Sequence, residues 1–407
     1  MTFGLRRLGI IFVVAVALSC AGCGADQSSD TRLAGWVSSP FESDAMQQIV
    51  TRFNEERVPG SLTYQPIQAN YIEKIQLMLG TGTAPDVFML ESFWAPTLIE
   101  YETLLPLDDL IAADERFDLE DFEPSLLEAF QHDGQTFGIP KDFSTIALFY
   151  NPEMFAAVGI ARPPESWSEL LDAAERLSQD IDGDGITDVY GFGAVDSIEF
   201  VLPFIWQNGG ELLTADGGID YQNQKAKEAI QFLKTMRDDS IAAVPTDLGA
   251  SWNMEAFGRG RIAMTISGLW AVNFLETTFP DMPYEIVPIP SGVRQQSIAY
   301  VVGYVIPRNT RDPAKAWEVL RYLTSKQGQQ EWASLDLGLP PRKSVVAATG
   351  LVDDPQRAVF IDAASYARTW QLGPNQRLMD ELQTAIQAIF LTDAPIEDAL
   401  KRADERL

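Results

Sequence analysis

Alternating carboxylates in one short segment could hold a divalent cation. Asp180, Asp182, Asp184 and Asp188 occupy positions 1, 3, 5 and 9 of a loop that has Gly185 at position 6. This spacing puts carboxylate oxygens on one side of a loop, and the glycine permits its sharp turn, as in calcium-binding loops. Position 12 is a glycine, so the bidentate ligand is missing unless another segment supplies it. The segment predicts a structural calcium ion or, alternatively, an acidic turn between a helix and a strand.

The scarcity of histidine and cysteine excludes several kinds of catalytic site. The chain has one histidine, His132, and its two cysteines are Cys20 and Cys23. The rest of the chain therefore has no thiol nucleophile, no cysteine-based zinc site and no disulfide. A Ser-His-Asp triad would need His132, which lies in the turn sequence His-Asp-Gly-Gln. Chemistry by paired carboxylates, as in glycosidases, is not excluded by composition.

Acidic and aromatic residues are plentiful. The 407 residues include 58 Asp and Glu against 30 Lys and Arg, a net charge of −28, with 22 Phe, 11 Tyr and 9 Trp. A sugar presents hydroxyl groups at its edge, which carboxylates bind strongly, and C–H groups on its faces, which pack on aromatic rings. The negative charge opposes phosphate backbones and anionic lipid headgroups. The composition indicates a receptor for a neutral or cationic small molecule and no nucleic-acid partner.

Alternating strands and helices must position these side chains. The length predicts two domains, and the alternation predicts the α/β class. The helix over residues 167–177 has a capping box, with Ser166 at its N-cap and Glu169 three residues later. Asp312 before Pro313 and Ser325 are expected to cap two further helices. Strands are expected over residues 33–37, 84–90, 136–140, 262–266 and 299–306, and other helices over 44–56 and within 355–407.

The N-terminus has the pattern of a secreted lipoprotein. Two arginines precede an apolar run over residues 8–18. The run would span roughly 17 Å of a bilayer core about 30 Å thick, so it is typical of a signal peptide rather than a transmembrane helix. Small residues before Cys23 resemble a lipobox, with Cys20 as the alternative lipidated residue. We predict a signal peptide over residues 1–22 and a flexible tether over 23–32, the alternative being a plain secretory signal.

Several segments together resemble a known family. The chain is similar to the extracellular solute-binding proteins of bacterial ABC importers, in particular the carbohydrate-binding type related to maltose-binding protein. The resemblance covers roughly residues 33–407, and its segments occur in the family's order. They are Gly82–Val87 (GTAPDV), Leu104–Asp108 (LLPLD), Phe149–Phe155 (FYNPEMF), Gly159–Ile160 with Pro163–Pro164 and Trp167, and Ala263–Trp270 (AMTISGLW).

The resemblance implies a periplasmic-binding-protein-like type II fold. This fold has two α/β lobes joined by crossing strands, with the ligand in the cleft between them and closure about the hinge. Because the chain crosses more than once, each lobe is discontinuous. Lobe 1 is expected over residues 31–141 plus 304–343, and lobe 2 over 144–303 plus 344–407.

The resemblance also implies where a sugar would bind. Trp270 lies just past a strand end, where open α/β sheets place ligands, and is expected to stack on a sugar ring. Gly303 and Tyr304 match the family's hinge motif, although a valine replaces its first glycine, and the glycine would let a sugar approach the backbone. Glu91 and Glu42 are expected to accept hydrogen bonds from sugar hydroxyls. Weaker candidates for the cleft are Asp142, Trp206, Trp252 and Arg368.

The predicted function is therefore a lipid-anchored, non-enzymatic receptor. It would capture a sugar, expected to be a di- or oligosaccharide, by cleft closure and deliver it to the membrane permease. It would act as a monomer on the outer face of the cytoplasmic membrane and need no cofactor apart from the calcium ion considered above. The alternatives are a receptor for a non-sugar solute, such as a glycerophosphodiester or a polyamine, and a secreted glycosidase with paired carboxylates.

Overall fold

A computed structural model of the protein describes residues 30–37, 40–56, 62–214, 217–335, 337–370 and 377–407. The predicted signal peptide and both cysteines, Cys20 and Cys23, lie outside the described residues. Residues 31 and 32, expected to end the tether, already belong to the first strand. Within the described ranges, no helix is both long enough and apolar enough to cross a membrane.

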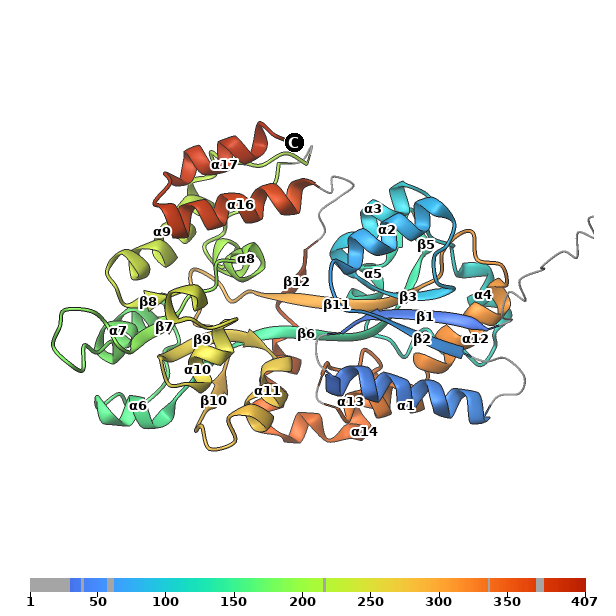
Figure 1. Cartoon of the computed structure of the whole chain (residues 1–407), viewed down its shortest axis with the longest axis horizontal. Helices are drawn as coiled ribbons and strands as arrows, with labels where there is room; N and C mark the ends of the chain where they lie inside the picture. The colour runs from blue at the N-terminus through green and yellow to red at the C-terminus, as the bar shows by residue number, and fades with distance from the viewer. Residues whose placement is uncertain (1–29, 38–39, 57–61, 215–216, 336, 371–376) are drawn as a thin grey trace, which may run out of the picture.

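Two lobes share one continuous mixed sheet (Figure 1). The strand order along the sheet is β2-β1-β3-β11-β6-β9-β7-β8, with β10 paired to β6 and β12 paired to β11. The lobe on the right of Figure 1, which we call lobe 1, carries the first three strands, and the lobe on the left, lobe 2, carries β7, β8, β9 and β10. The strands are β1 Thr31–Trp36, β2 Leu62–Ile67, β3 Val87–Glu91, β4 Gln131–His132, β5 Gln135–Thr136, β6 Gly138–Tyr150, β7 Tyr190–Gly193, β8 Ala242–Ala243, β9 Ile262–Gly268, β10 Glu285–Val287, β11 Ser297–Val305 and β12 Ala367–Thr369.

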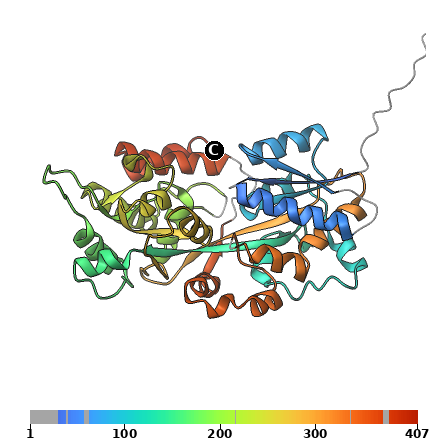
Figure 2. The same ribbon diagram turned by 60° about the horizontal axis from the view of Figure 1, so that its bottom comes forward.

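Helices cover both faces of the sheet in each lobe (Figures 1 and 2). Lobe 1 contains α1 Pro40–Glu56, α2 Tyr71–Thr81, α3 Ala95–Glu100, α4 Asp108–Ala113, α5 Pro124–Glu128, α12 Pro313–Leu323 and α13 Lys326–Ala333. Lobe 2 contains α6 Pro152–Ala157, α7 Trp167–Leu177, α8 Ile198–Gln207, α9 Gln224–Asp238, α10 Asn253–Gly258, α11 Trp270–Thr278, α15 Pro355–Ala363, α16 Arg377–Thr392 and α17 Ile396–Asp404, while α14 Lys343–Thr349 lies in the segment that returns from lobe 1 to lobe 2. This architecture confirms the predicted type II fold.

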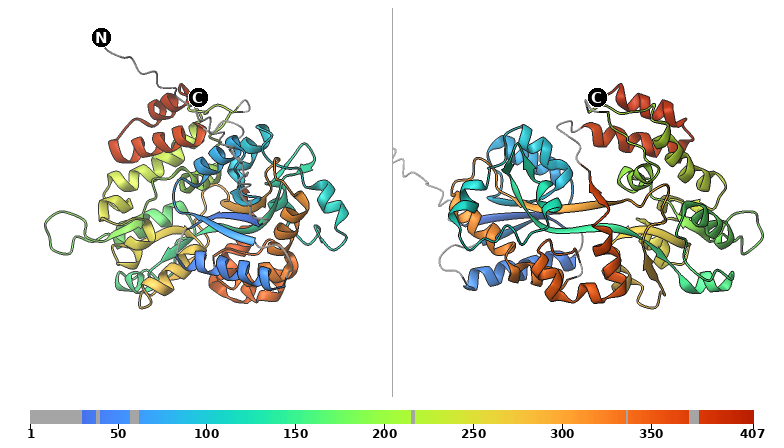
Figure 3. Two further views of the ribbon diagram at one scale, coloured as in Figure 1. Left: turned by 45° about the vertical axis from the view of Figure 1, so that its right-hand side comes forward. Right: turned by 180° about the vertical axis from the view of Figure 1, so that it is seen from behind.

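Two long antiparallel strands, β6 and β11, cross between the lobes. The view from behind shows both strands running through the middle of the molecule, where β12 pairs parallel with β11 (Figure 3). A further connection is pinned to β6 by a bridge in which Phe143 and Leu339 exchange both backbone hydrogen bonds. The lobe limits expected near residues 141–144 and 303–304 fall inside these two crossing strands.

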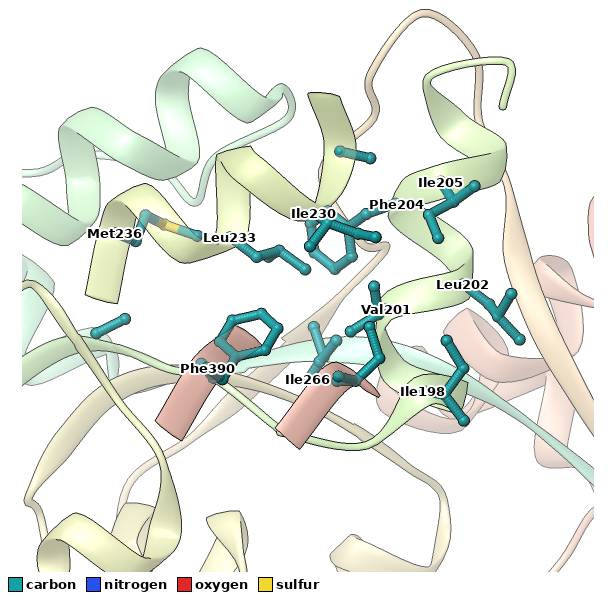
Figure 4. Close-up of a cluster of buried hydrophobic side chains, with 14 of the residues drawn as sticks. Ile198, Val201, Leu202, Phe204, Ile205, Ile230, Leu233, Met236, Ile266 and Phe390 are labelled. Carbon is teal, nitrogen blue, oxygen red and sulfur yellow. The ribbon is translucent and has the colours of Figure 1, made fainter. Parts of the chain in front are cut away.

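Apolar side chains hold helix α8 in place against its neighbours. Its residues Ile198, Val201 and Ile205 are fully buried and pack with side chains of α9 and with Phe390 of α16 (Figure 4). Burial of side chains of this size contributes about 1.5–3 kcal/mol each, so α8 has little freedom to shift. The start of α8 is thereby held at one place beside the crossing strands.

The capping predictions are confirmed with one difference. The side chains of Ser166, Asp312 and Ser325 accept hydrogen bonds from the backbone N–H groups of Glu169, Lys315 and Gly328, respectively. The capping box at Ser166 is not reciprocal, because the Glu169 carboxylate accepts from the N–H of Glu165 instead. The strand expected over residues 136–140 is part of the longer crossing strand, and β12 interrupts the predicted C-terminal helical region.

Candidate functional site

The carboxyl ends of strands from both lobes converge on the crossing strands. β3 and β6 both run antiparallel to β11, and β3 ends at Glu91, level with Asp142 of β6. β9 runs antiparallel to β6 and ends at Gly268, level with Ile146. At about 3.3 Å per residue, the two strand ends are about 13 Å apart along β6. Ligands of α/β proteins bind at such strand ends, so this is the candidate site.

Strand register puts candidate side chains on one face of the sheet. Val302 of β11 pairs with Glu91 on one side and with Asp142 on the other. Two residues earlier on β11, Tyr300 pairs with Ser144. Directly opposed residues, and residues two apart on one strand, share a face. These five side chains therefore form the floor of the site.

A carboxylate of lobe 2, that of Glu199, lies near the Glu91 carboxylate of the floor. Burial, and then the charges of Glu199 in α8 and Asp142, raise the pKa of Glu91 to about 7. Burial, and then the charges of Glu199 and Glu91, raise the pKa of Tyr300 well above its usual value. The Tyr300 hydroxyl oxygen is buried without a hydrogen-bond partner in the described part of the chain. A carboxylate from each lobe thus faces the same tyrosine.

The raised pKa of Glu91 predicts a pH-dependent stability. Its pKa rises from 4.5 in the unfolded chain to about 7 in the folded one. The folded state therefore binds the proton more tightly, and stability falls as the pH rises from about 4.5 through about 7, by on the order of 1–3 kcal/mol from this group. We expect Glu91→Gln to flatten that part of the pH profile of urea unfolding, relative to the unsubstituted protein. Parallel profiles for the two proteins would contradict the placement of Glu91 against Glu199, Asp142 and Tyr300.

Asp142 is held by lobe 1 rather than offered freely to a ligand. It is buried, forms an ion pair with Lys141 and accepts a hydrogen bond from the Trp332 indole of α13. The Lys141 ammonium also lies 3.4 Å from the centroid of the Trp332 ring. Lys141 is the extra residue where the register shifts between Val302 and Gly303, and such a bulge re-aims side chains. The cluster anchors the crossing strand to α13.

Trp270 lies as expected, just past the end of β9 at the start of α11. Its ring lies over Gly268, where an added Cβ would come within 2.2 Å of the ring. Its edge meets the Tyr300 ring with centroids 5.4 Å apart and planes at 88°. The backbone turn before it is fixed by Ser144, whose hydroxyl accepts from the N–H of Leu269 at 3.0 Å. The indole is partly exposed and lies beside the floor of the site.

Glu42 and Tyr304 lie together on the lobe 1 side. Glu42 is in the first turn of α1 and Tyr304 is on the same face of β11 as Val302, and both are buried. Burial and the charges of Asp142 and Glu42 contribute to raising the pKa of Tyr304 well above its usual value. Tyr304 packs in the lobe 1 core, and its contact with a ligand stays a prediction. Trp36, at the end of β1, is partly exposed, and it was not predicted as a site residue.

Gly303 has a packing role in place of the predicted ligand contact. It faces the opposite side of β11 from Tyr304, and a Cβ there would lie 2.6 Å from the Phe130 ring. The space beside this glycine is filled by an aromatic side chain, so a sugar cannot approach the backbone from that side.

This packing predicts the effect of Gly303→Ala. We expect a loss of about 1–3 kcal/mol in the free energy of unfolding, because the methyl group would displace Phe130. Ligand affinity of the folded protein should stay within a factor of two, as measured by calorimetry. A large loss of affinity with unchanged stability would instead restore the predicted ligand contact.

Trp206 and Arg368 line a different cavity between the lobes. This cavity of about 650 Å3 is also lined by Glu211, Ala299 and Leu126 of α5. The cavity residues Leu202, Trp206 and Trp370 belong to the apolar cluster on which Tyr300 and Trp270 also pack. The Arg368 guanidinium covers the Trp206 ring at 4.6 Å and pairs with Glu211 at 2.7 Å. Ligand contact by Trp206 and Arg368 stays a prediction.

Trp252 packs between α10 and α11. It precedes α10 and packs edge-on against Phe274 of α11, with ring centroids 4.6 Å apart. It packs against the apolar cluster that contains Ala299 and Val301 of β11, on which Trp270 also packs. Ligand contact by Trp252 stays a prediction.

Two central residues, Glu199 and Tyr300, were missed by sequence reasoning. Glu199 lies in the first turn of α8, shortly after β7 ends, but β7 is only four residues long and was not predicted. Tyr300 lies in a predicted strand at an even spacing from Tyr304, so alternation alone puts it on the same face. That alternation was the available signal for Tyr300.

The acidic loop brings three of its four predicted ligands together. One carboxylate oxygen from each of Asp180, Asp182 and Asp188 lies within 4.8 Å of the others, and Asp184 is not in the group. Asp180 already accepts hydrogen bonds from the N–H groups of Gly183 and Gly185. Calcium binding here stays a prediction.

If calcium binds, millimolar Ca2+ should raise the melting temperature and a chelator should reverse the effect. Asp182→Asn should remove most of the shift. The same melting temperature with Ca2+ and with a chelator would favour the acidic-turn interpretation.

Comparisons with known proteins agree with this fold. The profile of the family described as bacterial extracellular solute-binding protein matches residues 48–359. A protein of Brucella abortus (strain 2308) is 25% identical over 375 residues, covering 88% of each chain. The galactooligosaccharide-binding protein of Bacillus subtilis (strain 168) is 23% identical, covering 96% of this chain and 94% of its own.

Solved structures share the fold. An ABC substrate-binding protein from Listeria monocytogenes in complex with cycloalternan superposes with a TM-score of 0.83 at 20% identity, covering 93% of this chain and 97% of its own. UgpB from Mycobacterium tuberculosis in complex with glycerophosphocholine superposes with a TM-score of 0.80 at 21% identity, covering 92% and 96% of the two chains.

Proposed function

This chain belongs to the bacterial extracellular solute-binding protein family, and from that premise we propose that it is the lipid-anchored substrate-binding subunit of an ABC importer. It captures a saccharide between its two lobes and delivers it to the membrane permease. The observation that carries the proposal is the meeting of Glu91 from lobe 1 and Glu199 from lobe 2 about Tyr300, with Trp270 beside them.

A saccharide fits the chemistry of this site better than a phosphodiester. Carboxylates accept hydrogen bonds from sugar hydroxyls, and Trp270 and Tyr300 offer rings for the C–H faces. A phosphodiester would meet carboxylates from both lobes, and Lys141 is already paired with Asp142. The oligosaccharide-binding relatives support the same choice.

Capture is proposed to work by closure about β6 and β11. Glu91 and Glu199 belong to different lobes, so a ligand that contacts both stabilises the arrangement in which the lobes approach. Closure without a ligand brings like charges together, which favours an open form of the free receptor. The apparent affinity then depends on the contacts and on the free-energy difference between the open and closed forms.

The cellular setting follows the N-terminal sequence. We propose lipidation at Cys23, with Cys20 as the alternative, and a location on the outer face of the cytoplasmic membrane. The partner is the permease of the importer, and the receptor works as a monomer that returns its ligand unchanged.

Calorimetric titration of the full chain in mild detergent tests the function. Mono-, di- and oligosaccharides are the ligands, spermidine and glycerophosphocholine are the controls, and each mixture is analysed afterwards for cleavage. Saturable binding of a saccharide that is recovered intact supports the receptor. Cleavage of the saccharide, or binding of a control ligand alone, refutes the proposal.

A further inference from the structure

Among the described residues, the carboxylates of Glu91 and Glu199 have no cation as a partner. Glu91 makes no side-chain hydrogen bond or ion pair with any residue in the described ranges, and its charged neighbours are Glu199 and Asp142. Glu199 accepts a hydrogen bond from Ser197, a neutral partner. Lys141 contributes one positive charge, and its ion pair with Asp142 already uses that charge. The site therefore holds carboxyl groups from both lobes with no free cation among the described residues, and the pKa of Glu91, raised to about 7 by burial and by the charges of Glu199 and Asp142, shows that their repulsion is not relieved.

The Tyr300 hydroxyl lies beside the same two carboxylates. Its hydroxyl oxygen is shielded from solvent, finds no hydrogen-bond partner among the described residues and is influenced by both Glu91 and Glu199. A buried hydroxyl without a partner costs about 1–3 kcal/mol, so the bound state is expected to satisfy it. This hydroxyl is an observation independent of the carboxylates, and it indicates a ligand group between them.

The number and type of these acceptors distinguish between ligand groups. A sugar hydroxyl has one proton to donate, so it can pair with one of the two carboxylates and leaves the negative charge in place. An ammonium group has three N–H donors, no acceptor and a positive charge. Two carboxylates and one phenol oxygen offer it three acceptors, and charge-assisted hydrogen bonds are the stronger ones.

We propose that the solute is an amino sugar whose ammonium group binds between Glu91 and Glu199 and donates a hydrogen bond to the Tyr300 hydroxyl. This inference rests on the proposed saccharide-receptor function and adds the charge of the ligand to it. Ring C–H groups of the same sugar lie on Trp270, and the ammonium group links lobe 1 to lobe 2. Binding then removes the like-charge repulsion that opposes closure.

Matched saccharides that differ at one substituent test the proposal. The disaccharide of β-1,4-linked glucosamine is compared by calorimetry at pH 7 with its N-acetylated form and with cellobiose. Glucosamine, galactosamine and mannosamine are compared in the same way with glucose, galactose and mannose. We expect at least one free amine to bind about tenfold or more tightly than both of its neutral counterparts. Equal or tighter binding of the neutral counterparts throughout would overturn the proposal.

Variants that replace a carboxylate with a neutral amide show which residues cause the preference for the amine. Glu199→Gln and Glu91→Gln should reduce the preference for the amine to less than about threefold, because each weakens the amine more than its neutral counterparts. Tyr300→Phe should weaken the amine more than the neutral sugar. Glu211→Gln is the matched control, because Glu211 is also a lobe 2 carboxylate but is already paired with Arg368. An amine preference that survives both site variants would overturn the proposed position.

The outcomes separate this inference from the function on which it rests. If a neutral saccharide binds and no amine is preferred, the charge inference fails and the saccharide receptor stands. If no saccharide of either kind binds, both fail. Melting curves of every variant confirm that the compared proteins are folded.

Discussion

Replacing Trp270 with alanine is expected to weaken saccharide binding by about 10- to 100-fold. The indole lies over Gly268 on one side and meets Tyr300 at its edge, so its position is fixed before the ligand arrives. Large preorganised aromatic side chains are the usual centres of binding energy, and losing one costs about 1.4–2.8 kcal/mol for such a change in affinity. Calorimetric titration with the saccharide that binds the unsubstituted protein measures the change.

Two further variants separate stacking from folding. Trp270→Phe keeps a ring at the same position and should recover much of the affinity. Trp252→Phe is the matched control in the same lobe, since the Trp252 ring packs edge-on against Phe274. Unchanged affinity of Trp270→Ala, in a protein with a normal melting temperature, would remove Trp270 from the site.

Much of the fold could be predicted because local signals and the family's order of segments agree. Helix caps at Ser166, Asp312 and Ser325 use short-range hydrogen bonds that the sequence shows directly. The long crossing strand β6 was harder to predict, since its 13 residues are buried throughout and have no alternation of exposed and buried positions. A uniformly buried strand lacks the period of two by which strands are recognised.

The site residues were predictable where they follow a strand end. Glu91 and Trp270 follow strands with clear sequence signals, and both lie at the candidate site. Glu199 follows a four-residue strand that sequence alone did not indicate. Trp206 and Arg368 were weaker candidates, and residue type alone could not show that their side chains meet in the cavity between the lobes. That meeting depends on register, which long-range pairing sets.

The second large effect is expected from a buried arginine at the connection that leaves lobe 1. The Arg342 Nε donates to the Thr324 carbonyl at 2.7 Å, and one Nη donates to the Asp118 carbonyl at 2.9 Å and to Asp121 at 3.2 Å. The guanidinium also lies 4.0 Å from the Phe122 ring centroid. Arg342→Met removes these hydrogen bonds and the positive charge beside Asp121. We expect the free energy of unfolding in urea to fall by about 3–5 kcal/mol.

Lysine at position 342 should not restore the lost free energy of unfolding, and removal of an exposed ion pair should cost much less than removal of Arg342. Lysine lacks the planar fork that reaches three acceptors in fixed directions, so Arg342→Lys should recover less than half of the loss. Arg308→Met is the control: the Arg308–Glu102 pair is 3.5 Å apart with both side chains more than half exposed, and its removal should cost less than about 1 kcal/mol. Because Arg342 contacts lobe 1 only, the affinity of the folded variant should be unchanged in conditions where it remains folded. A loss of affinity together with normal stability would mean that this connection transmits lobe closure to the site.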